Sequence, residues 1–461
     1  MRQGRCTLPA DEAGRILDRL AGLEQVISAE AIRQALEATG RLNGRSCVLS
    51  HAVMLQVVVA MGVLTELPIR QVFKHARRLR VGEPTPARSS LCEARQRLGV
   101  EPVRHLFHHV VRPQATPPTL GAFYRGFRLM GCDGTVLDVP DSDANAAAFG
   151  RANGSRGAGA FPQVRKVSLV EIGTHIEIAF AAGGWQDSEQ ALAKTLFDQV
   201  PADALLLEDR GFFSYPAWKE LMARRIALLV RVKSHLVLRP IRRLADGSFL
   251  ATIYASQKDR RNDRGGRVVR VSEYQLDDPQ RAGHGETHRL MTTLLDADTF
   301  PAAELILLYH ERWEEELVFD EQKTHQDPRR ATKPAQLRSE TPEGVRQELY
   351  ALSLGHFVTR ALMLQAATQA HLDVDRLSFT GCFQILKCRL PECARGTPEA
   401  FAEWVESVLW EMQQEVIEPR RNRINPRVIK RKMSKWPKKR PEHRRLPPLK
   451  KRFEETVVMV N

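Results

Sequence analysis

The sequence predicts an α/β protein in which helices flank a mixed sheet, with a helical domain before it and a basic tail after it. Three observations predict this class. Residues 11–115 carry apolar side chains at helical spacing. Five short apolar stretches between residues 127 and 232 have the composition of strands. Helical stretches separate or follow these strands, as is typical of a mixed α/β sheet. A chain of 461 residues is expected to form two to four domains.

The N-terminal region is predicted to be helical up to a break at residues 113–118. Asp11–Leu23 carries apolar residues at helical spacing, and Ala52–Leu64 has the composition of a buried core helix. Ser90-Leu-Cys-Glu93 has the form of a capping box, and it would open a helix that carries Arg95 and Arg97. This domain either reads DNA or is a structural helical cap, and the residues leave both interpretations open.

The middle of the chain is predicted to form the sheet. The expected strands are Phe127–Cys132, Val164–Ile172, His175–Ala181, Ala204–Glu208 and Ala227–Val232. The second and third, separated at Gly173, are predicted to form a hairpin. Ser188–Gln199 and Tyr215–Arg224 are predicted helices between strands. From Lys233 to about Thr293 the sequence predicts charged strands and turns, and helices follow at 301–325, 341–371 and 398–416.

Positive charge is concentrated near the C-terminus. Between Pro419 and Arg452 there are sixteen Lys or Arg residues and one acidic residue, Glu442, a balance of +15 within a total of +14. The rest of the chain is therefore almost neutral. A segment of this kind, here with Lys430, Arg431 and Lys432 at its centre, neutralises DNA phosphates without reading bases. The alternative is a solvated tail that has no partner.

The sequence argues against secretion, membrane insertion and a disulfide framework. The seven cysteines are odd in number and include no Cys-x-x-Cys pair, which favours free thiols in a reducing compartment. The apolar stretch at 52–64 is too short to span a bilayer. The first fifteen residues lack the apolar core of a signal peptide. The expected location is therefore the cytoplasm.

One predicted helix, 301–325, carries a polar stripe. Tyr309, Arg312, Glu316 and Lys323 stand at offsets 0, 3, 7 and 14, which fall on one side of a regular helix. The stripe suits a phosphodiester chain and a metal. A solvated salt-bridged face explains the same spacing, because Arg312 and Glu316 are an ordinary i,i+4 pair. Spacing alone favours this second interpretation.

Two further carboxylates change that balance. Asp133 and Asp209 each directly follow a predicted apolar strand, and ligand sites of open α/β sheets gather at the carboxyl ends of strands. Together with Glu316 they offer three hard oxygen ligands, a set that suits Mg²⁺ and also Mn²⁺. Nearby acidic residues rank lower as ligands; these are Glu208, Asp138, Asp141 and Asp143.

These motifs resemble those of a known family. The spacing Tyr-x2-Arg-x3-Glu-x6-Lys in YHERWEEELVFDEQK resembles the YREK signature of the insertion-sequence-four family of DDE transposases. CDGTVLDVPDS (132–142) and EDRGFFSY (208–215) resemble the motifs around that family's first and second aspartates. RLMTTLLDADTFPAAELILLYHERWEEE (289–316) and KRKMSKWP (430–437) are similar to the same family, so the resemblance runs from about Ser89 to Pro437.

The resemblance implies an RNase H-like core that a β-rich insertion interrupts. The expected parts are a helical domain (1–118), the first part of the core (119–232), the insertion (233–296), the second part of the core (297–375), a helical region (376–418) and the basic tail (419–461). It also implies that Arg312 and Lys323 contact DNA phosphates beside Tyr309, and Arg210 is a further candidate. In some members of the family a Trp of the insertion stacks in place of a flipped DNA base. No Trp lies between Trp218 and Trp313 in this chain, although Tyr254 or Tyr274 could take this role.

The expected function is that of a bacterial insertion-sequence transposase. Asp133, Asp209 and Glu316 are the expected catalytic, metal-binding residues, Mg²⁺ the cofactor, and DNA the partner, with a homodimer in the synaptic complex. The chemistry would be two-metal phosphoryl transfer. Two alternatives stay open: a non-catalytic DNA-binding repressor derived from a transposase, and a metal-dependent nuclease that does not transfer strands.

Overall fold

The computed structural model describes residues 17–42, 47–77, 84–154, 157–279, 284–327, 337–393, 397–418 and 451–460. Residue contacts divide the chain into two compact units, each described by itself. Unit 1 comprises Met1–Phe123, Asp133–Gln199 and Glu314–Ile417, and unit 2 comprises Tyr124–Cys132, Val200–Trp313 and Glu418–Asn461. Within the described ranges, no helix combines the length and apolar character needed to cross a membrane.

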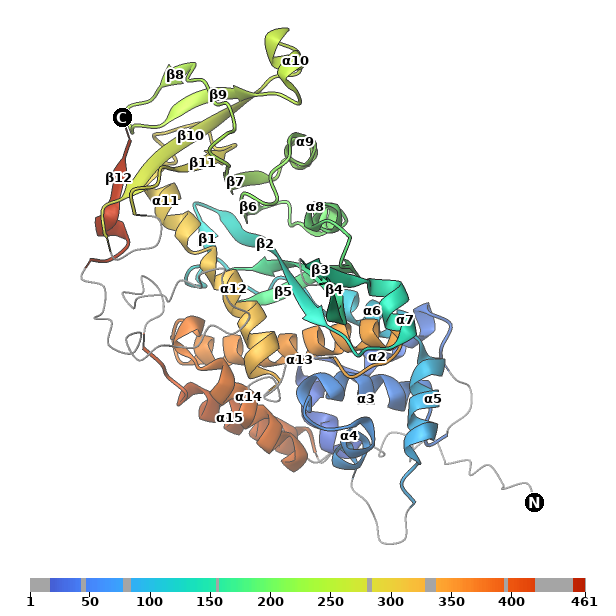
Figure 1. Cartoon of the computed structure of the whole chain (residues 1–461). Helices are drawn as coiled ribbons and strands as arrows, with labels where there is room; N and C mark the ends of the chain where they lie inside the picture. The colour runs from blue at the N-terminus through green and yellow to red at the C-terminus, as the bar shows by residue number, and fades with distance from the viewer. Residues whose placement is uncertain are drawn as a thin grey trace. The chain divides into compact units, whose positions relative to one another are not determined.

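The first part of unit 1 is helical, as predicted (Figure 1). Its elements are η1 (Asp18–Gln25), α2 (Ala29–Ala38), α3 (His51–Val63), α4 (Ile69–Ala76), α5 (Arg88–Leu98) and α6 (Glu101–Val110). The stretch predicted as a buried core helix is α3, in which almost every residue from Val53 to Val63 is buried. Because this helix is apolar on all sides, it requires neighbours all round it.

Two details of the helical prediction are wrong. The described part of the predicted helix at 11–23 is a 3-10 helix, and residues 11–16 lie outside the described residues. The proposed capping box does not cap α5, because this helix starts at Arg88 after Ala87, which makes no side-chain cap hydrogen bond. Ser90 therefore lies inside the first turn of α5.

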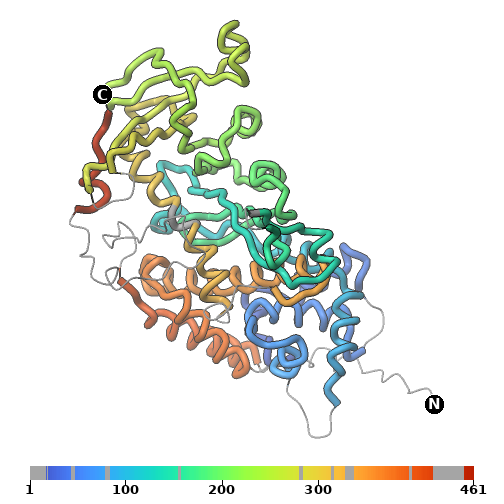
Figure 2. The backbone as a smooth tube through the Cα atoms, viewed as in Figure 1, coloured from blue at the N-terminus to red at the C-terminus, as the bar shows by residue number. Residues whose placement is uncertain are grey.

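A long helix, α13 (Pro342–Gln369), forms the centre of unit 1. It packs on α3, α6, α14 (Phe379–Arg389) and α15 (Pro398–Gln413), and Figure 2 shows it as the long orange segment among these helices. Its approach to α3 is close. A Cβ atom added at Gly62 would lie 1.8 Å from the carbonyl oxygen of Ala351, and one at Gly355 would lie 2.4 Å from that of Gly62. Only glycine permits this contact between the two helices.

The strands of unit 1 pair around β4. This part of unit 1 contains the second half of β2 (Phe127–Asp138), α7 (Asp143–Phe149), β3 (Arg151–Gly154), β4 (Gly157–Glu171), β5 (Ile176–Gly184), α8 (Glu189–Lys194) and η2 (Phe197–Gln199). The predicted hairpin is confirmed, since β4 and β5 pair antiparallel from Val164↔Gly184 to Glu171↔Ile176. The predicted helix at 188–199 is instead the short α8 followed by a 3-10 turn.

Unit 2 contains three parallel strands. The first half of β2 pairs with β6 (Ala204–Glu208), and β6 pairs with β7 (Ala227–Arg231), with α9 (Tyr215–Ala223) between β6 and β7 in the chain. All five residues of β6 are buried. Continuous apolar runs are typical of parallel strands covered on both faces, which explains why the predicted bounds of β6 agree with the structure.

The β-rich region continues the same sheet. It contains β8 (Arg242–Arg243), β9 (Phe249–Ile253), α10 (Gln257–Arg261), β10 (Arg267–Leu276) and β11 (His288–Thr292). These strands follow β7 in the order β11-β10-β9-β8, and each neighbouring pair is antiparallel. The strands predicted at 233–293 are thus extra strands on the edge of the parallel set.

The end of the chain does not form a free tail. After Lys451 come η8 (Glu454–Thr456) and β12 (Val457–Met459), which pairs antiparallel with β10. Phe453 is buried and its ring stacks on His310 with 3.9 Å between centroids. The predicted tail is therefore attached to unit 2 through its last ten described residues. Lys430, Arg431 and Lys432 lie outside the described residues.

Candidate active site

Two adjacent parallel strands lead to the two candidate aspartates. The register of β2 and β6 runs from Arg128↔Ala204 to Cys132↔Glu208. Asp133 and Asp209 are the next residue on each strand, and both are half-buried. Asp209 follows β6 directly, as predicted. Asp133 does not follow its strand, because β2 continues to Asp138 and its second half takes part in the sheet of unit 1. Asp138, expected in a loop, therefore closes a strand.

Asp133 lies at a crowded point of unit 1. Its Oδ1 accepts a hydrogen bond from the backbone N–H of Gly134 at 2.7 Å. A Cβ atom on Gly134 would come within 3.0 Å of the carboxyl group of Glu189. Glu189 in turn accepts a hydrogen bond from Arg165 at 3.3 Å. Glu189 is thus a carboxylate beside Gly134, whose side-chain direction on β2 is opposite to that of Asp133. Nothing in the sequence signals this contact, because Glu189 starts a short helix far along the chain from Gly134.

Asp209 lies in unit 2 with Tyr309 and Arg312. Tyr309 is buried, and its hydroxyl donates to the carbonyl oxygen of Glu208 at 3.3 Å. The guanidinium of Arg312, also buried, lies 5.8 Å from the centroid of the Tyr309 ring. Burial raises the pKa of Tyr309, and the negative charge of Asp209 raises it further. The phenol is therefore a neutral hydrogen-bonding group at physiological pH.

Glu208 is buried within β6, next to Asp209 in the chain. Burial raises its pKa from 4.5 to about 7, because a carboxylate loses hydration when it is enclosed by apolar groups. Its environment therefore differs from that of the half-buried Asp209. A carboxyl group that is partly protonated at neutral pH is a weaker cation ligand, which supports the ranking of Glu208 below Asp209.

The predicted continuous helix at 301–325 is wrong. The chain forms α11 (Ala302–His310), a turn at residues 311–312, α12 (Trp313–Asp320) and a π-helical turn, η3 (Glu321–His325). Hydrogen bonds from Glu311 to Leu308 and from Arg312 to Tyr309 tighten the turn, and a bond from Gln326 to Glu321 widens the last segment. The regular spacing from which the single stripe was deduced is therefore interrupted at residues 311–312 and again at Glu321–His325. Tyr309 and Arg312 belong to unit 2, whereas Glu316 and Lys323 belong to unit 1.

Lys323 contacts the second half of β2. Its ammonium group donates to the hydroxyl of Thr135 and, at 3.1 Å, to the carbonyl oxygen of Val136. These residues follow Asp133 by two and three positions. Glu316 is exposed on α12, seven residues before Lys323. Arg210 is exposed directly after Asp209. Unit 1 thus brings Lys323 to the strand that carries Asp133.

Two buried polar networks hold the π-helical turn. Glu321 accepts from Arg360 at 3.0 Å and contacts His356 at 2.9 Å. Arg360 donates to Nδ1 of His175 at 2.6 Å, so the other ring nitrogen faces Asp375 at 3.3 Å. All five side chains are almost fully buried. Burial raises the pKa of Glu321, but Arg360 and the two histidines outweigh it and hold this pKa well below its usual range.

The second network starts from Gln322. Its amide donates to Glu177 at 3.1 Å, and its oxygen accepts from Lys166 at 3.0 Å. Lys166 also bonds Glu177 and Ser353 inside unit 1. Burial raises the pKa of Glu177, but the Lys166 ammonium outweighs it and lowers the pKa overall. Consecutive residues of the π-helical turn are thus each fixed by buried charged groups.

The chemistry of the predicted ligands fits a divalent cation. Three carboxylates provide hard oxygen donors, the ligand type that Mg²⁺ and Mn²⁺ prefer. Across the described ranges, no group of three His, Cys, Asp or Glu side chains is placed to hold a metal ion. The six described cysteines are free thiols, as predicted.

Comparison with known proteins decides the family. The family model described as "Insertion element 4 transposase N-terminal" matches residues 17–108, and the model described as "Transposase DDE domain" matches residues 129–354. The transposase InsG for insertion sequence element IS4 of Escherichia coli K12 is 29% identical over 433 residues, which cover 91% of this chain and 93% of InsG. The chain belongs to the insertion element 4 family of DDE transposases.

It is therefore an insertion-sequence transposase, an enzyme of DNA strand cleavage and transfer, as the sequence predicted. A second relative, the putative transposase InsZ of the same organism, is 29% identical over 160 residues, which cover 31% of this chain and 54% of InsZ. Among solved structures, the piggyBac transposase synaptic complex with hairpin DNA matches with a TM-score of 0.41 and 11% identity over 87% of each chain. Membership of the DDE family implies that a divalent metal ion is used.

Proposed function

We propose that this transposase cleaves DNA at the ends of its element and joins those ends to target DNA, with Asp133, Asp209 and Glu316 as its catalytic carboxylates. The observation that supports the proposal most strongly is the pairing Cys132↔Glu208 in β2 and β6. Because these strands are parallel, the residues after the pair leave it in the same direction. Two aspartates occupy those positions.

The proposed core is RNase H-like. The strand order β4-β2-β6-β7, with β5 paired to β4, supports this assignment. So do the parallel register of β2, β6 and β7 and the antiparallel hairpin of β4 and β5. The β-rich region would then be an insertion between the second aspartate and Glu316. The six parts proposed from the sequence keep this division, with the core at 119–232 and 297–375.

The proposed cofactor is Mg²⁺, with Mn²⁺ as a substitute, and Asp133, Asp209 and Glu316 would hold it. When bound, such a cation lowers the pKa of an attacking water and stabilises the leaving 3′-oxygen. Carboxylates are suited to this role because they coordinate hard cations without donating protons. The family match supports a divalent metal, and the choice of Mg²⁺ rests on the oxygen-only donor set.

The chain's other residues would position the DNA strand. In the cleavage step a water oxygen bonds to phosphorus, the bond to the 3′-oxygen breaks, and a free 3′-OH forms; that hydroxyl then attacks a phosphate of target DNA. Arg312, stacked on the Tyr309 ring, and Lys323, fixed to β2, are proposed to contact phosphates of the strand. Arg210 and the basic Lys430, Arg431 and Lys432 would add contacts without base recognition.

The partners proposed are the element's terminal repeats and target DNA, and the active assembly is proposed to be a homodimer on the nucleoid. The names of the relatives, both transposases, support DNA as the partner. A complex of two protein chains on paired ends would be measured by light scattering on the assembled nucleoprotein. A one-chain complex that completes strand transfer would contradict the homodimer.

Cleavage of a supercoiled plasmid that carries the element's ends tests the proposal. We expect Mg²⁺-dependent nicking and joined products from the wild type, and none with EDTA. Asp133→Asn, Asp209→Asn and Glu316→Gln should each abolish cleavage while the shift of end DNA in a gel persists. Asp143→Asn, which alters an exposed carboxylate on α7, is the matched control and should cut normally.

The same assay separates the alternative functions. Wild-type protein that shifts the DNA without cutting it would be a repressor, and protein that cuts without joined products would be a nuclease. Full nicking by any one of the three carboxylate variants would refute its assignment.

A further inference from the structure

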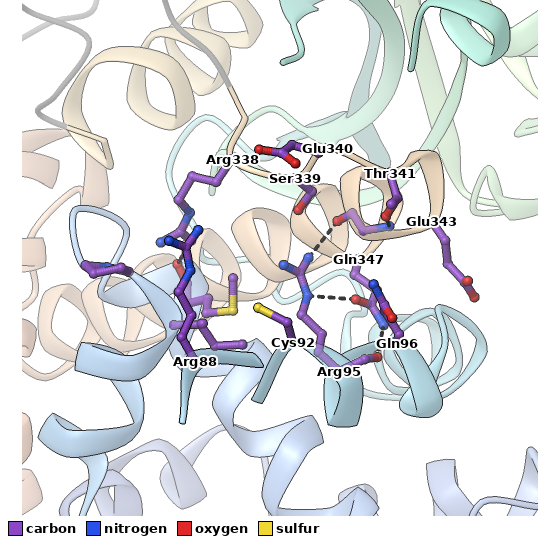
Figure 3. A pocket seen from close by; sticks show the side chains of 14 residues that line it. Arg88, Cys92, Arg95, Gln96, Arg338, Ser339, Glu340, Thr341, Glu343 and Gln347 are labelled. Carbon is purple, nitrogen blue, oxygen red and sulfur yellow. Dashed lines mark hydrogen bonds between the residues drawn. The ribbon is translucent and has the colours of Figure 1, made fainter. Parts of the chain in front are cut away.

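Unit 1 contains a cavity of about 440 Å³ where α5 meets the start of α13 (Figure 3). Its wall is made of residues from α3, α5, the segment after α3 and the start of α13. The polar residues that line it are Arg88, Cys92, Arg95, Gln96, Arg338, Ser339, Glu340, Thr341, Glu343 and Gln347. Three of these are arginines. A cavity of this volume accommodates a ligand larger than a single ion.

Arg338 is neutralised within the protein. Its Nε donates to the buried carboxylate of Glu348 at 2.7 Å, and the same carboxylate accepts from two backbone N–H groups. Glu348 is buried and held in the charged form, because Arg338 and Arg95 outweigh the rise in its pKa that burial causes. One carboxylate thus balances the first of the three guanidinium groups.

Arg95 is held mainly by neutral acceptors. Its Nε donates to the side-chain oxygen of Gln347 at 2.8 Å, and Nη2 donates to the carbonyl oxygen of Gly344 at 2.7 Å. Figure 3 shows the side chain reaching from α5 to the start of α13 beside Cys92. Across the described residues, no carboxylate forms an ion pair with it. Arg95 is half-buried, and Glu348 acts on it only through its charge and not through a direct ion pair.

Arg88 adds a second cation at the cavity. It is exposed at the first position of α5, and the described part of the chain offers it no ion pair or hydrogen bond. The two carboxylates of the lining, Glu340 and Glu343, are exposed. Glu343 accepts from the backbone N–H of Val100, and its side chain points away from Arg95 (Figure 3). The cavity therefore presents two guanidinium groups, those of Arg88 and Arg95, that form no ion pair within the described residues.

We propose that this cavity binds a phosphate of the DNA backbone through Arg88 and Arg95. The inference rests on the proposed function as a DNA-cleaving transposase, and it adds a contact outside the carboxylate site. Guanidinium groups match the oxygens of a phosphate with paired hydrogen bonds. Arg95 is already oriented by Gln347 and Gly344, so binding of a phosphate would not require its side chain to be reordered.

The salt dependence of DNA binding tests the contact. The probe is a duplex that carries the element's end, titrated over a range of salt concentrations. Each phosphate contact contributes about 0.9 to the slope of log K against log salt. Arg88→Ala and Arg95→Gln should each lower that slope by up to about 0.9 and weaken binding by about tenfold at low salt. Arg97→Ala is the matched control, because Arg97 lies on the same helix, pairs with Glu93 and does not line the cavity.

Thiol alkylation gives a local readout that does not depend on folding of a variant. Cys92 lines the cavity and is half-buried, whereas Cys388 is exposed on α14. End DNA should slow alkylation of Cys92 several-fold and leave Cys388 unchanged. Inorganic phosphate at matched ionic strength should not protect Cys92.

The outcomes separate this inference from the proposed function. Equal salt slopes for wild type, Arg88→Ala and Arg95→Gln, or Cys92 that DNA does not protect, would overturn the inference even if cleavage is normal. Protection of Cys92 by inorganic phosphate alone would assign the cavity to free phosphate and overturn it too. A wild-type protein that neither binds nor cuts end DNA would refute the proposed function itself.

Discussion

The buried carboxylate of Glu321 provides the sharpest test of how unit 1 is held together. Glu321 accepts from Arg360 and contacts His356, and each of the three side chains is almost fully buried. Glu321→Gln keeps the shape of the side chain and removes its charge. The guanidinium of Arg360 would then be buried without a balancing charge on the π-helical turn.

The expected cost follows from this burial. Removal of one partner of a buried ion pair typically destabilises a protein by about 3–5 kcal/mol, because the remaining charge is desolvated and unpaired. Here the retained amide still accepts one hydrogen bond, so we expect a loss of roughly 3 kcal/mol in the free energy of unfolding. Glu321→Leu combined with Arg360→Met should recover part of this loss, since an apolar pair of similar size needs no desolvation of charge.

The stabilisation by Glu321 should depend on pH in a direction set by the shift of its pKa. The pKa of Glu321 is well below its ordinary value of 4.5 in the folded protein. Its contribution to stability is therefore complete above pH 4.5 and is lost as pH falls through the folded pKa. His356 also makes the protein less stable as pH falls. Burial lowers its pKa below 6.5 in the folded protein, so the unfolded chain binds the proton at a higher pH than the folded protein does. Wild-type stability should fall below pH 6.5, and the difference from Glu321→Gln should shrink below pH 4.5.

Urea denaturation followed by circular dichroism measures these differences. The midpoint should shift at constant slope, which identifies a change in stability rather than in the unfolded state. Glu37→Gln is the control, because Glu37 pairs with Arg33 on the exposed surface of α2, and its midpoint should match that of the wild type. A Glu321→Gln protein within about 1 kcal/mol of wild type at neutral pH would refute the reasoning.

Three other substitutions test separate contacts. Gly62→Ala should destabilise unit 1 by at least about 1–3 kcal/mol in urea denaturation, because its new Cβ meets the backbone of α13; an unchanged midpoint would show that the two helices can separate. Phe453→Ala should cost about 3–5 kcal/mol through loss of a buried ring, whereas Val458→Ala, on the exposed side of β12, should cost little; equal effects would contradict the attachment of the C-terminal strand. Glu208→Gln should stabilise the protein above pH 7, by at most roughly 3 kcal/mol. Because the pKa of Glu208 is raised to about 7 in the folded protein, its contribution to wild-type stability is greatest below pH 4.5 and is lost as pH rises through about 7. The Gln variant does not titrate there, so parallel stability-against-pH profiles of the two proteins would contradict the prediction.

The strands that lead to the aspartates could be predicted because their sequence is locally unambiguous. Ala204–Glu208 is a short apolar run between turns, and it forms β6 with the predicted bounds. Asp209 is therefore placed correctly at the end of a strand. The first aspartate is less well predicted, since β2 continues past Asp133 through Gly134 and Thr135 to Asp138. Continuation there depends on a neighbouring strand, which the local sequence does not reveal.

Contacts between segments that lie far apart in the chain could not be predicted from the sequence. Glu189 comes close to Gly134, and Arg95 donates to Gly344 across about 250 positions of the chain. The basic segment was interpreted as a tail, yet the residues after it pair with β10. Residues 419–450 of this segment lie outside the described residues, and their charge density does not reveal that the chain pairs with β10 beyond them.

The failure of the predicted helix at 301–325 has a physical cause that also explains the place of Lys323. Consecutive residues of a regular helix point about 100° apart. Glu321 and Gln322 nevertheless each enter a different buried network, and both networks include residues of α13. A π-helical turn provides the extra residue that satisfies both, and such turns are frequent at functional sites. Lys323 follows Glu321 and Gln322 within this turn, and it bonds to the strand that carries Asp133. Regular spacing predicts that Lys323 aligns with Glu316, and the structure shows its ammonium group bonded to Thr135 and Val136, two and three residues after the first aspartate.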